Sequence, residues 1–164
     1  MGRGERSVMK RKILIMLLTL VICVSGVVNW GICARAEVSA EDIDMSELMT
    51  GDALVGYAES QTWGVYLIDG YSVINKISST KVGAGGTTNA AVQCSVRITS
   101  ILERKVNGNW LRVTSWSQTN TNAYYAMISK SVTVPSGYYY RVRSNHYASS
   151  DTASSCTNAL WVGN

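Results

Sequence analysis

Regular alternation of apolar and polar side chains is the dominant pattern in the second half of the chain. Between residues 92 and 99, Val92, Cys94, Val96 and Ile98 fall at every second position, with polar residues between them. This alternation predicts a β-strand with one buried face. An Asn-Gly pair at 107–108 follows. Both residues of such a pair accept positive φ, so a tight hairpin is predicted there.

Shorter runs rich in β-branched and aromatic residues predict the other strands. Each run is bounded by Gly, Asn, Ser or Pro, which favour turns. The predicted strands cover residues 63–67, 71–76, 81–85, 92–99, 110–116, 123–134, 138–147 and 159–162. About eight short strands with regular turns predict an antiparallel sandwich or barrel.

The strand at residues 138–147 has two distinct faces. Its inward positions are Tyr138, Tyr140, Val142, Ser144 and His146, because the alternate set carries two arginines that belong in water. The turn 135–137 ahead of this strand is typical of an immunoglobulin- or fibronectin-like sandwich, where a tyrosine hydroxyl bonds back to the backbone. Either Tyr138 or Tyr140 is expected to make this hydrogen bond. The predicted fold class is therefore an all-β, small antiparallel β-sandwich of this type, spanning residues 62–164.

Residues 1–36 have the pattern of a secretion signal peptide. Five basic side chains occur in the first twelve residues, and residues 13–28 contain nothing more polar than Thr and Ser. Small residues in Ala34-Arg35-Ala36 then match the positions that a signal peptidase reads. Cleavage after Ala36 and an extracellular, secreted protein are predicted. The alternative is an uncleaved N-terminal membrane anchor, because an apolar run extended to Ala34 is long enough to span a bilayer.

Removal of the signal changes the charge of the chain. Six of the fifteen basic residues and one of the eleven acidic residues lie in residues 1–36. The mature chain then has nine basic and ten acidic residues, a net charge of −1. The apparent basicity therefore does not indicate nucleic-acid binding.

The remaining charges are unevenly distributed. Residues 37–81 hold eight acids and two lysines, whereas seven basic and two acidic residues follow. Residues 37–61 are interpreted as an acidic leader, either a short helix with a capping box at Ser39 or a flexible segment. The asymmetry suggests contact between this leader and the basic body.

Two cysteines remain in the mature chain, Cys94 and Cys156. In an exported protein, an even pair is most simply one disulfide. Two buried free thiols are the alternative. With a single histidine and no close cysteine pair, the sequence predicts no metal site and no cofactor.

Six segments, taken together and in this order, resemble a domain-of-unknown-function family of small exported Firmicutes proteins, chiefly from clostridia. They are Ile101-Leu-Glu-Arg-Lys105, Asn107-Gly-Asn-Trp110, Ser129-Lys-Ser-Val-Thr-Val134, Gly137-Tyr-Tyr-Tyr-Arg-Val-Arg143, His146-Tyr-Ala148 and Thr157-Asn-Ala-Leu-Trp161. The resemblance spans roughly the last hundred residues. It implies export and a β-rich fold, and it implies no known activity.

Catalytic patterns are scarce in the sequence. His146, the only histidine, falls on the inward parity, where a structural role is expected. After residue 82 only Glu103 and Asp151 could serve as a carboxylate pair for glycoside hydrolysis. The chain is therefore not expected to be an enzyme.

A binding role is the favoured hypothesis. The outward positions Tyr139, Arg141, Arg143 and Tyr147 form a stripe of aromatic and basic side chains, beside which Arg97 would lie, and Arg112 also if the hairpin pairs in register. Such a face suits cell-wall or host glycans and other anionic polymers outside a Gram-positive cell. Contact with a membrane is expected only through an uncleaved signal. The alternatives are a bacteriocin-like exported effector or a structural subunit of an envelope assembly.

Two tryptophans leave a question open. Trp110 and Trp116 share one parity of the predicted strand at 110–116. Together they form either a carbohydrate platform or part of the core face, and the pattern supports both interpretations.

Overall fold

The computed structural model describes residues 38–60 and 64–164, most of which form antiparallel β-strands. The signal peptide predicted at residues 1–36 and its cleavage site at Ala36 lie outside the described residues. The elements are β1 (Ala40–Asp42), α2 (Met45–Leu48), β2 (Leu54–Tyr57), β3 (Glu59–Ser60), β4 (Leu67–Ser78), β5 (Lys81–Val106), β6 (Asn109–Thr133), β7 (Tyr138–Ala148), β8 (Asp151–Cys156) and β9 (Leu160–Val162). The predicted all-β, antiparallel class is confirmed. The immunoglobulin- or fibronectin-like assignment stays a prediction.

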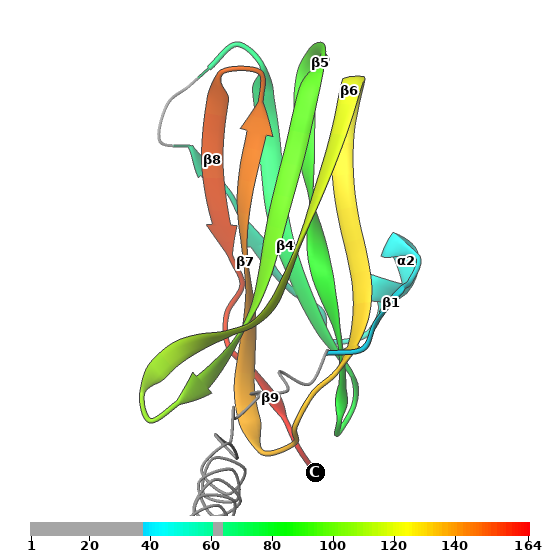
Figure 1. Ribbon diagram of the computed structural model, residues 1–164, viewed down its shortest axis with the longest axis vertical. Helices are drawn as coiled ribbons and strands as arrows, with labels where there is room; N and C mark the ends of the chain where they lie inside the picture. The colour runs from blue at the N-terminus through cyan, green and yellow to red at the C-terminus, as the bar shows by residue number, and fades with distance from the viewer. Residues whose placement is uncertain (1–37, 61–63) are drawn as a thin grey trace, which may run out of the picture. The chain divides into compact units, whose positions relative to one another are not determined.

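The long strands β5 and β6 organise the fold. They pair from Lys81↔Thr133 to Val106↔Asn109, and the Asn107-Gly108 turn between them has the predicted positive φ values of 50° and 83°. Register shifts between residues 89 and 96 interrupt the ladder. There both strands turn back on themselves at one end of the molecule (Figure 1). Each strand therefore contributes one arm to each of two layers.

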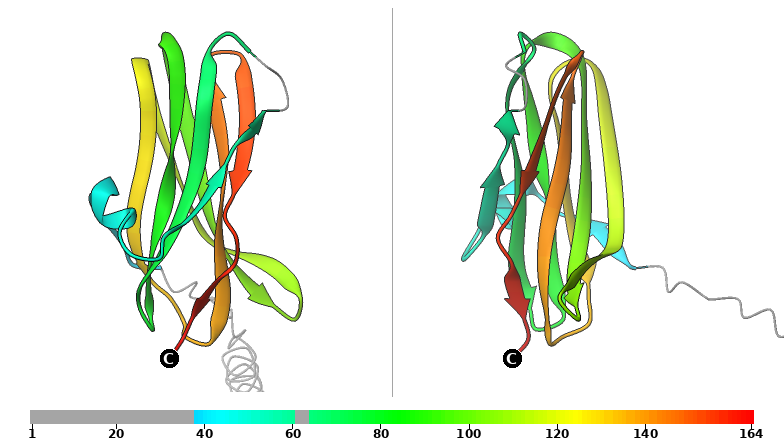
Figure 2. Two further views of the ribbon diagram at one scale, coloured as in Figure 1. Left: turned by 180° about the vertical axis from the view of Figure 1, so that it is seen from behind. Right: turned by 90° about the vertical axis from the view of Figure 1, so that its left-hand side faces the viewer.

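The two layers are defined by the strands that pair with these arms. The first layer contains β1, β2, β4, residues 81–90 of β5 and residues 125–133 of β6. The second contains β3, β7, β8, β9, residues 96–106 of β5 and residues 109–120 of β6. Figure 2 shows the strands of the first layer, such as β4, beside those of the second, such as β7.

Apolar side chains from both layers meet in the interior. One buried cluster joins Ile74 and Val82 of the first layer to Leu102 and Val142 of the second. Another, nearer the bend of β5, includes Ile98 and Ala126. The alternation seen in the sequence thus buries one face of each layer, and this burial is the main stabilising contribution to the fold.

The turn before β7 contains the expected tyrosine contact. The Tyr140 hydroxyl donates a hydrogen bond to the Pro135 carbonyl oxygen at 2.7 Å, and Tyr140 is fully buried. The inward assignment of Tyr138 was wrong, because Tyr138 is 36% exposed. It lies at the start of β7, where the Arg104 guanidinium, 4.6 Å from the centre of its ring, covers it instead of the core.

Most of the acidic segment 38–60 joins the first layer, and its last residues, in β3, pair with β8 of the second. β1 pairs with the end of β6, and Glu41 and Asp42 form ion pairs with Lys81 and Lys130. Asp44 caps the N-terminus of the short helix α2, and its carboxylate accepts hydrogen bonds from the Ser46 hydroxyl and the Ser46 backbone N–H. These two hydrogen bonds lower the pKa of Asp44. This segment therefore contributes strands and a helical turn to the fold.

The predicted disulfide between Cys94 and Cys156 is absent, because both cysteines are free. Cys156 pairs with Arg143, which pairs with Ile101, and Cys94 lies seven residues from Ile101 along β5. At about 3.3 Å per residue, the two cysteines are about 23 Å apart along the strand direction. A disulfide requires Cα atoms within about 7 Å. Neither thiol is fully buried, since Cys94 is half-buried and Cys156 is exposed.

The described residues include no helix with the length and apolar character needed to span a membrane.

Candidate functional site

The five residues predicted to form a binding face lie together on the second layer. Arg97 on β5 pairs in register with Tyr147 on β7, and Tyr139, Arg141 and Arg143 follow at alternate positions of β7. Residues that pair in register project from the same side of a sheet. We call this side of the second layer, which points away from the interior, the outer face.

Glu103 fixes the two central arginines of the outer face. Its carboxylate accepts hydrogen bonds from Arg141 Nε at 2.7 Å and from an Arg143 terminal nitrogen at 3.2 Å. Glu103 is only 6% exposed although it carries a charge. Because both guanidinium groups have further N–H donors, each can still bind an anion from a fixed position.

Aromatic rings border these arginines on both sides. Tyr139 and Trp161 pair in register between β7 and β9, with ring centres 5.0 Å apart, and they are 47% and 44% exposed. On the other side, the Arg141 guanidinium carbon lies 4.2 Å from the centre of the Trp110 ring. Arg97 stacks on Tyr147 at 4.0 Å. Cation–π contacts of this kind hold both the rings and the charges in place.

A β-bulge lies between Trp110 and Trp116, the two tryptophans that the sequence pattern could not assign to the core or to the surface. Glu103 pairs with Arg112, but the next residue of β5, Leu102, pairs with Thr114, so Val113 is the extra residue. The bulge reverses which parity of β6 faces outward. Trp110 consequently lies on the outer face, and Trp116 is partly buried against both core clusters.

The outer face carries a net positive charge. On strands β5, β6 and β7 its basic residues are Arg97, Lys105, Arg112, Arg141 and Arg143, and the acid on these strands is Glu103, which gives them a net charge of +4. Arg112 joins the face because the hairpin pairs in register. Trp161, Lys105 and Glu103 were not predicted to belong to this face. Glu103 and Lys105 could have been, because they have the same parity as Arg97 along β5.

His146 lies in the interior, away from the outer face. It is fully buried, and its two ring nitrogens share hydrogen bonds of 2.8 Å with the Thr88 and Ser155 hydroxyls. From Ser155 the bonded hydroxyls continue through Ser72 to Ser144 and then to Ser100. Burial lowers the pKa of His146 to about 4, partly opposed by Asp69. This is the structural histidine that the strand parity predicted.

Asp151 also has a structural role. Its carboxylate accepts hydrogen bonds from the Leu67 and Tyr66 backbone N–H groups, and these bonds lower its pKa. It thereby joins the start of β4 to the turn between β7 and β8. Within the described part of the chain, no group of three or more His, Cys, Asp or Glu side chains is arranged to hold a metal ion.

Comparison with known proteins identifies a family and nothing more specific. The model of a family of unknown function (DUF6147) matches residues 38–162. No curated protein and no solved structure matches the chain.

Proposed function

The chain belongs to the family of unknown function DUF6147, and we propose that it is a secreted, non-catalytic module that binds an anionic carbohydrate surface through its outer face. The observation that carries the proposal is the group of rigid, accessible aromatic rings around fixed arginines. Tyr139 and Trp161 are nearly half exposed although they contact each other. Tyr and Trp side chains are enriched at surfaces that bind a partner.

The chemistry of these side chains suits an acidic glycan. The C–H groups of a sugar ring carry partial positive charge and stack on the electron-rich face of an aromatic ring. Guanidinium groups bind phosphate or carboxylate through two parallel hydrogen bonds. Trp110 and Trp161 flank Arg141 and Arg143 across four strands, so one polymer can contact rings and charges together.

A non-catalytic role agrees with the positions of the groups that could act as a base or a nucleophile. Both nitrogens of His146 are already hydrogen-bonded in the interior. Glu103 is ion-paired with two arginines, and Asp151 is bonded to backbone N–H groups. None of these three groups is free to exchange a proton with a bound substrate.

The alternative of an effector masked by its acidic segment has less support. The acids of β1 pair with Lys81 and Lys130, neither of which belongs to the outer face. With residues 38–60 in place, the arginines of the outer face therefore remain uncovered. Removing this segment would not be needed to expose them.

Sedimentation with purified Gram-positive cell walls tests the proposal. We expect the Arg141→Ala, Arg143→Ala double variant to bind walls containing teichoic acid about tenfold more weakly or worse, because two charge-assisted contacts are lost. Binding by the unchanged protein should also weaken as salt is raised and after teichoic acid is extracted.

The matched control is the Lys81→Ala, Lys130→Ala double variant. It removes an equal number of positive charges, but from the first layer. Wall binding by this control should stay close to that of the unchanged protein. Equal loss in both double variants would mean that net charge alone drives binding, and no loss in the arginine variant would exclude the outer face.

A further inference from the structure

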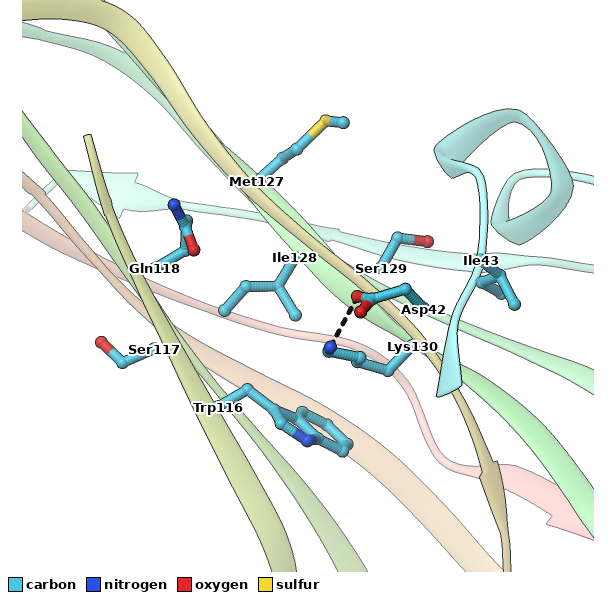
Figure 3. A pocket seen from close by; sticks show the side chains of 9 residues that line it. All are labelled: Asp42, Ile43, Trp116, Ser117, Gln118, Met127, Ile128, Ser129 and Lys130. Atoms are coloured by element: carbon cyan, nitrogen blue, oxygen red, sulfur yellow. Dashed lines mark ion pairs between the residues drawn. The ribbon is translucent and has the colours of Figure 1, made fainter. Parts of the chain in front are cut away.

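A separate groove lies at the open edge between the two layers. It has a volume of about 320 Å³ and lies between residues 116–118 of one β6 arm and residues 127–130 of the other, beside β1. Figure 3 shows the side chains that line it. β6 is the edge strand of the second layer, and β1 covers only its last residues in the first layer, so the groove opens to solvent.

The base of the groove is apolar and well supported. Trp116 and Ile128 extend into it from opposite arms of β6 (Figure 3). Trp116 packs against both core clusters, so its indole has little freedom to move. A fixed indole beside an open cavity is a preformed stacking surface.

Residues on both sides of the groove take part in polar contacts. On one side, the Gln118 side chain donates to the Asn120 side chain, which donates to the Tyr125 carbonyl oxygen at 2.9 Å. On the other side, Lys130 forms an ion pair with Asp42 of β1. The space between these contacts suits a compact ligand better than an extended peptide.

We propose that this groove binds a single neutral sugar ring, at a site distinct from the outer face. The Trp116 indole would stack on the ring. The opposite charges of Lys130 and Asp42 cancel, so the groove offers donors and acceptors for hydroxyl groups without selecting an anion. Gln118, Ser117 and Ser129 add further polar groups along the rim. The outer face, by contrast, has five basic residues and one acid on β5, β6 and β7, and it suits anionic groups.

Saturation-transfer NMR with three neutral trisaccharides (chitotriose, maltotriose and xylotriose) tests the groove. We expect signal transfer from the protein to at least one of them, with the strongest effect on protons of one ring. Lys130→Met, which keeps the alkyl chain, and Gln118→Leu, at an exposed position, should each weaken binding about tenfold, the effect of one lost hydrogen bond to a charged or polar group. Thermal melting confirms that each variant is folded.

Arg141→Ala serves as the matched control, because it alters the outer face and leaves the groove intact. It should bind the trisaccharide as the unchanged protein does, and Lys130→Met should retain binding to anionic cell walls. Failure of all three sugars to bind would overturn the proposal, as would binding by both groove variants that equals binding by the unchanged protein. Either result leaves the outer face to be judged by its own experiment.

Discussion

The outer surfaces of the two layers are built in opposite ways. In the first layer, Gly83 and Gly85 leave a hollow that the Leu48 side chain fills, and Leu48 is fully buried. In the second layer, the corresponding surface carries large side chains that cover one another, such as Arg141 over Trp110. Small residues in a sheet therefore need a cover from elsewhere in the chain. Long amphipathic side chains need none.

Because of this difference, the outer surface of the first layer contributes to the stability of the fold, and the outer face of the second layer is available for binding. The hollow of the first layer is specific for its own segment, because a Cβ at Gly83 would lie 2.7 Å from Leu48 Cδ1. Asn75 and Ser129 add hydrogen bonds to the backbone around α2. The first layer thus uses its outer surface to hold α2, whereas the second leaves its outer face accessible.

The largest expected effect comes from emptying the hollow. Leu48→Ala should lower the free energy of unfolding by about 3 kcal/mol, because it removes a buried side chain and leaves a cavity. Urea denaturation measures this change. Met49→Ala is the control, since Met49 is 44% exposed in the same helical turn, and it should cost far less. The folded Leu48→Ala protein should bind cell walls normally, and a loss of wall binding would contradict the separation of the two surfaces.

The free energy of unfolding should depend on pH because of His146, which lies in the interior between the two layers. Its pKa is lowered to about 4 in the folded protein, whereas an unfolded histidine titrates near 6.5. Below pH 6.5 the unfolded chain therefore binds a proton that the folded protein does not, and stability falls as pH drops toward 4. Between pH 7 and pH 5 the expected loss is about 2 kcal/mol.

Urea denaturation at several pH values measures this loss, and His146→Gln is the comparison. Glutamine does not titrate, so the variant should be less stable at pH 7 but should lose less stability between pH 7 and pH 5. The same slope in both proteins would show that another group causes the pH dependence.

The smallest expected change in stability concerns the outer face. Glu103→Gln removes the carboxylate that holds Arg141 and Arg143. Because those arginines are partly exposed, the free energy of unfolding should fall by only about 1 kcal/mol. The net charge of the face rises by one, so wall binding at low salt should strengthen. Binding that weakens instead would mean that the positions of the arginines matter more than their charge.

Much of the second layer could be predicted from the sequence. Strand β7 has strict alternation, and its outward residues Tyr139, Arg141 and Arg143 lie on one face as predicted. The Asn107-Gly108 turn was equally clear, because few residues accept the positive φ that it requires. Such local rules depend only on neighbouring residues.

Strand β8 was missed because its residues have little intrinsic preference for a strand. Asp151–Cys156 is made of small polar residues that resemble a loop. It is a strand because every residue of β8 pairs with β7, and because the Ser155 hydroxyl is hydrogen-bonded to Ser72 and His146 in the interior. These contacts come from residues distant in sequence, so local propensity gives no sign of them.

Local alternation and turn residues were enough to predict the β class, the main hairpin, the two faces of β7 and the inward position of His146. Only the tertiary structure decided that Cys94 and Cys156 lie too far apart to bond, and that Leu48 fills a hollow in the first layer. It also decided, through one bulge at Val113, that Trp110 faces outward and Trp116 inward. The physical reason is that alternation fixes side-chain direction only within an unbroken ladder. Bends, bulges and the stacking of layers depend on contacts between segments far apart in the chain.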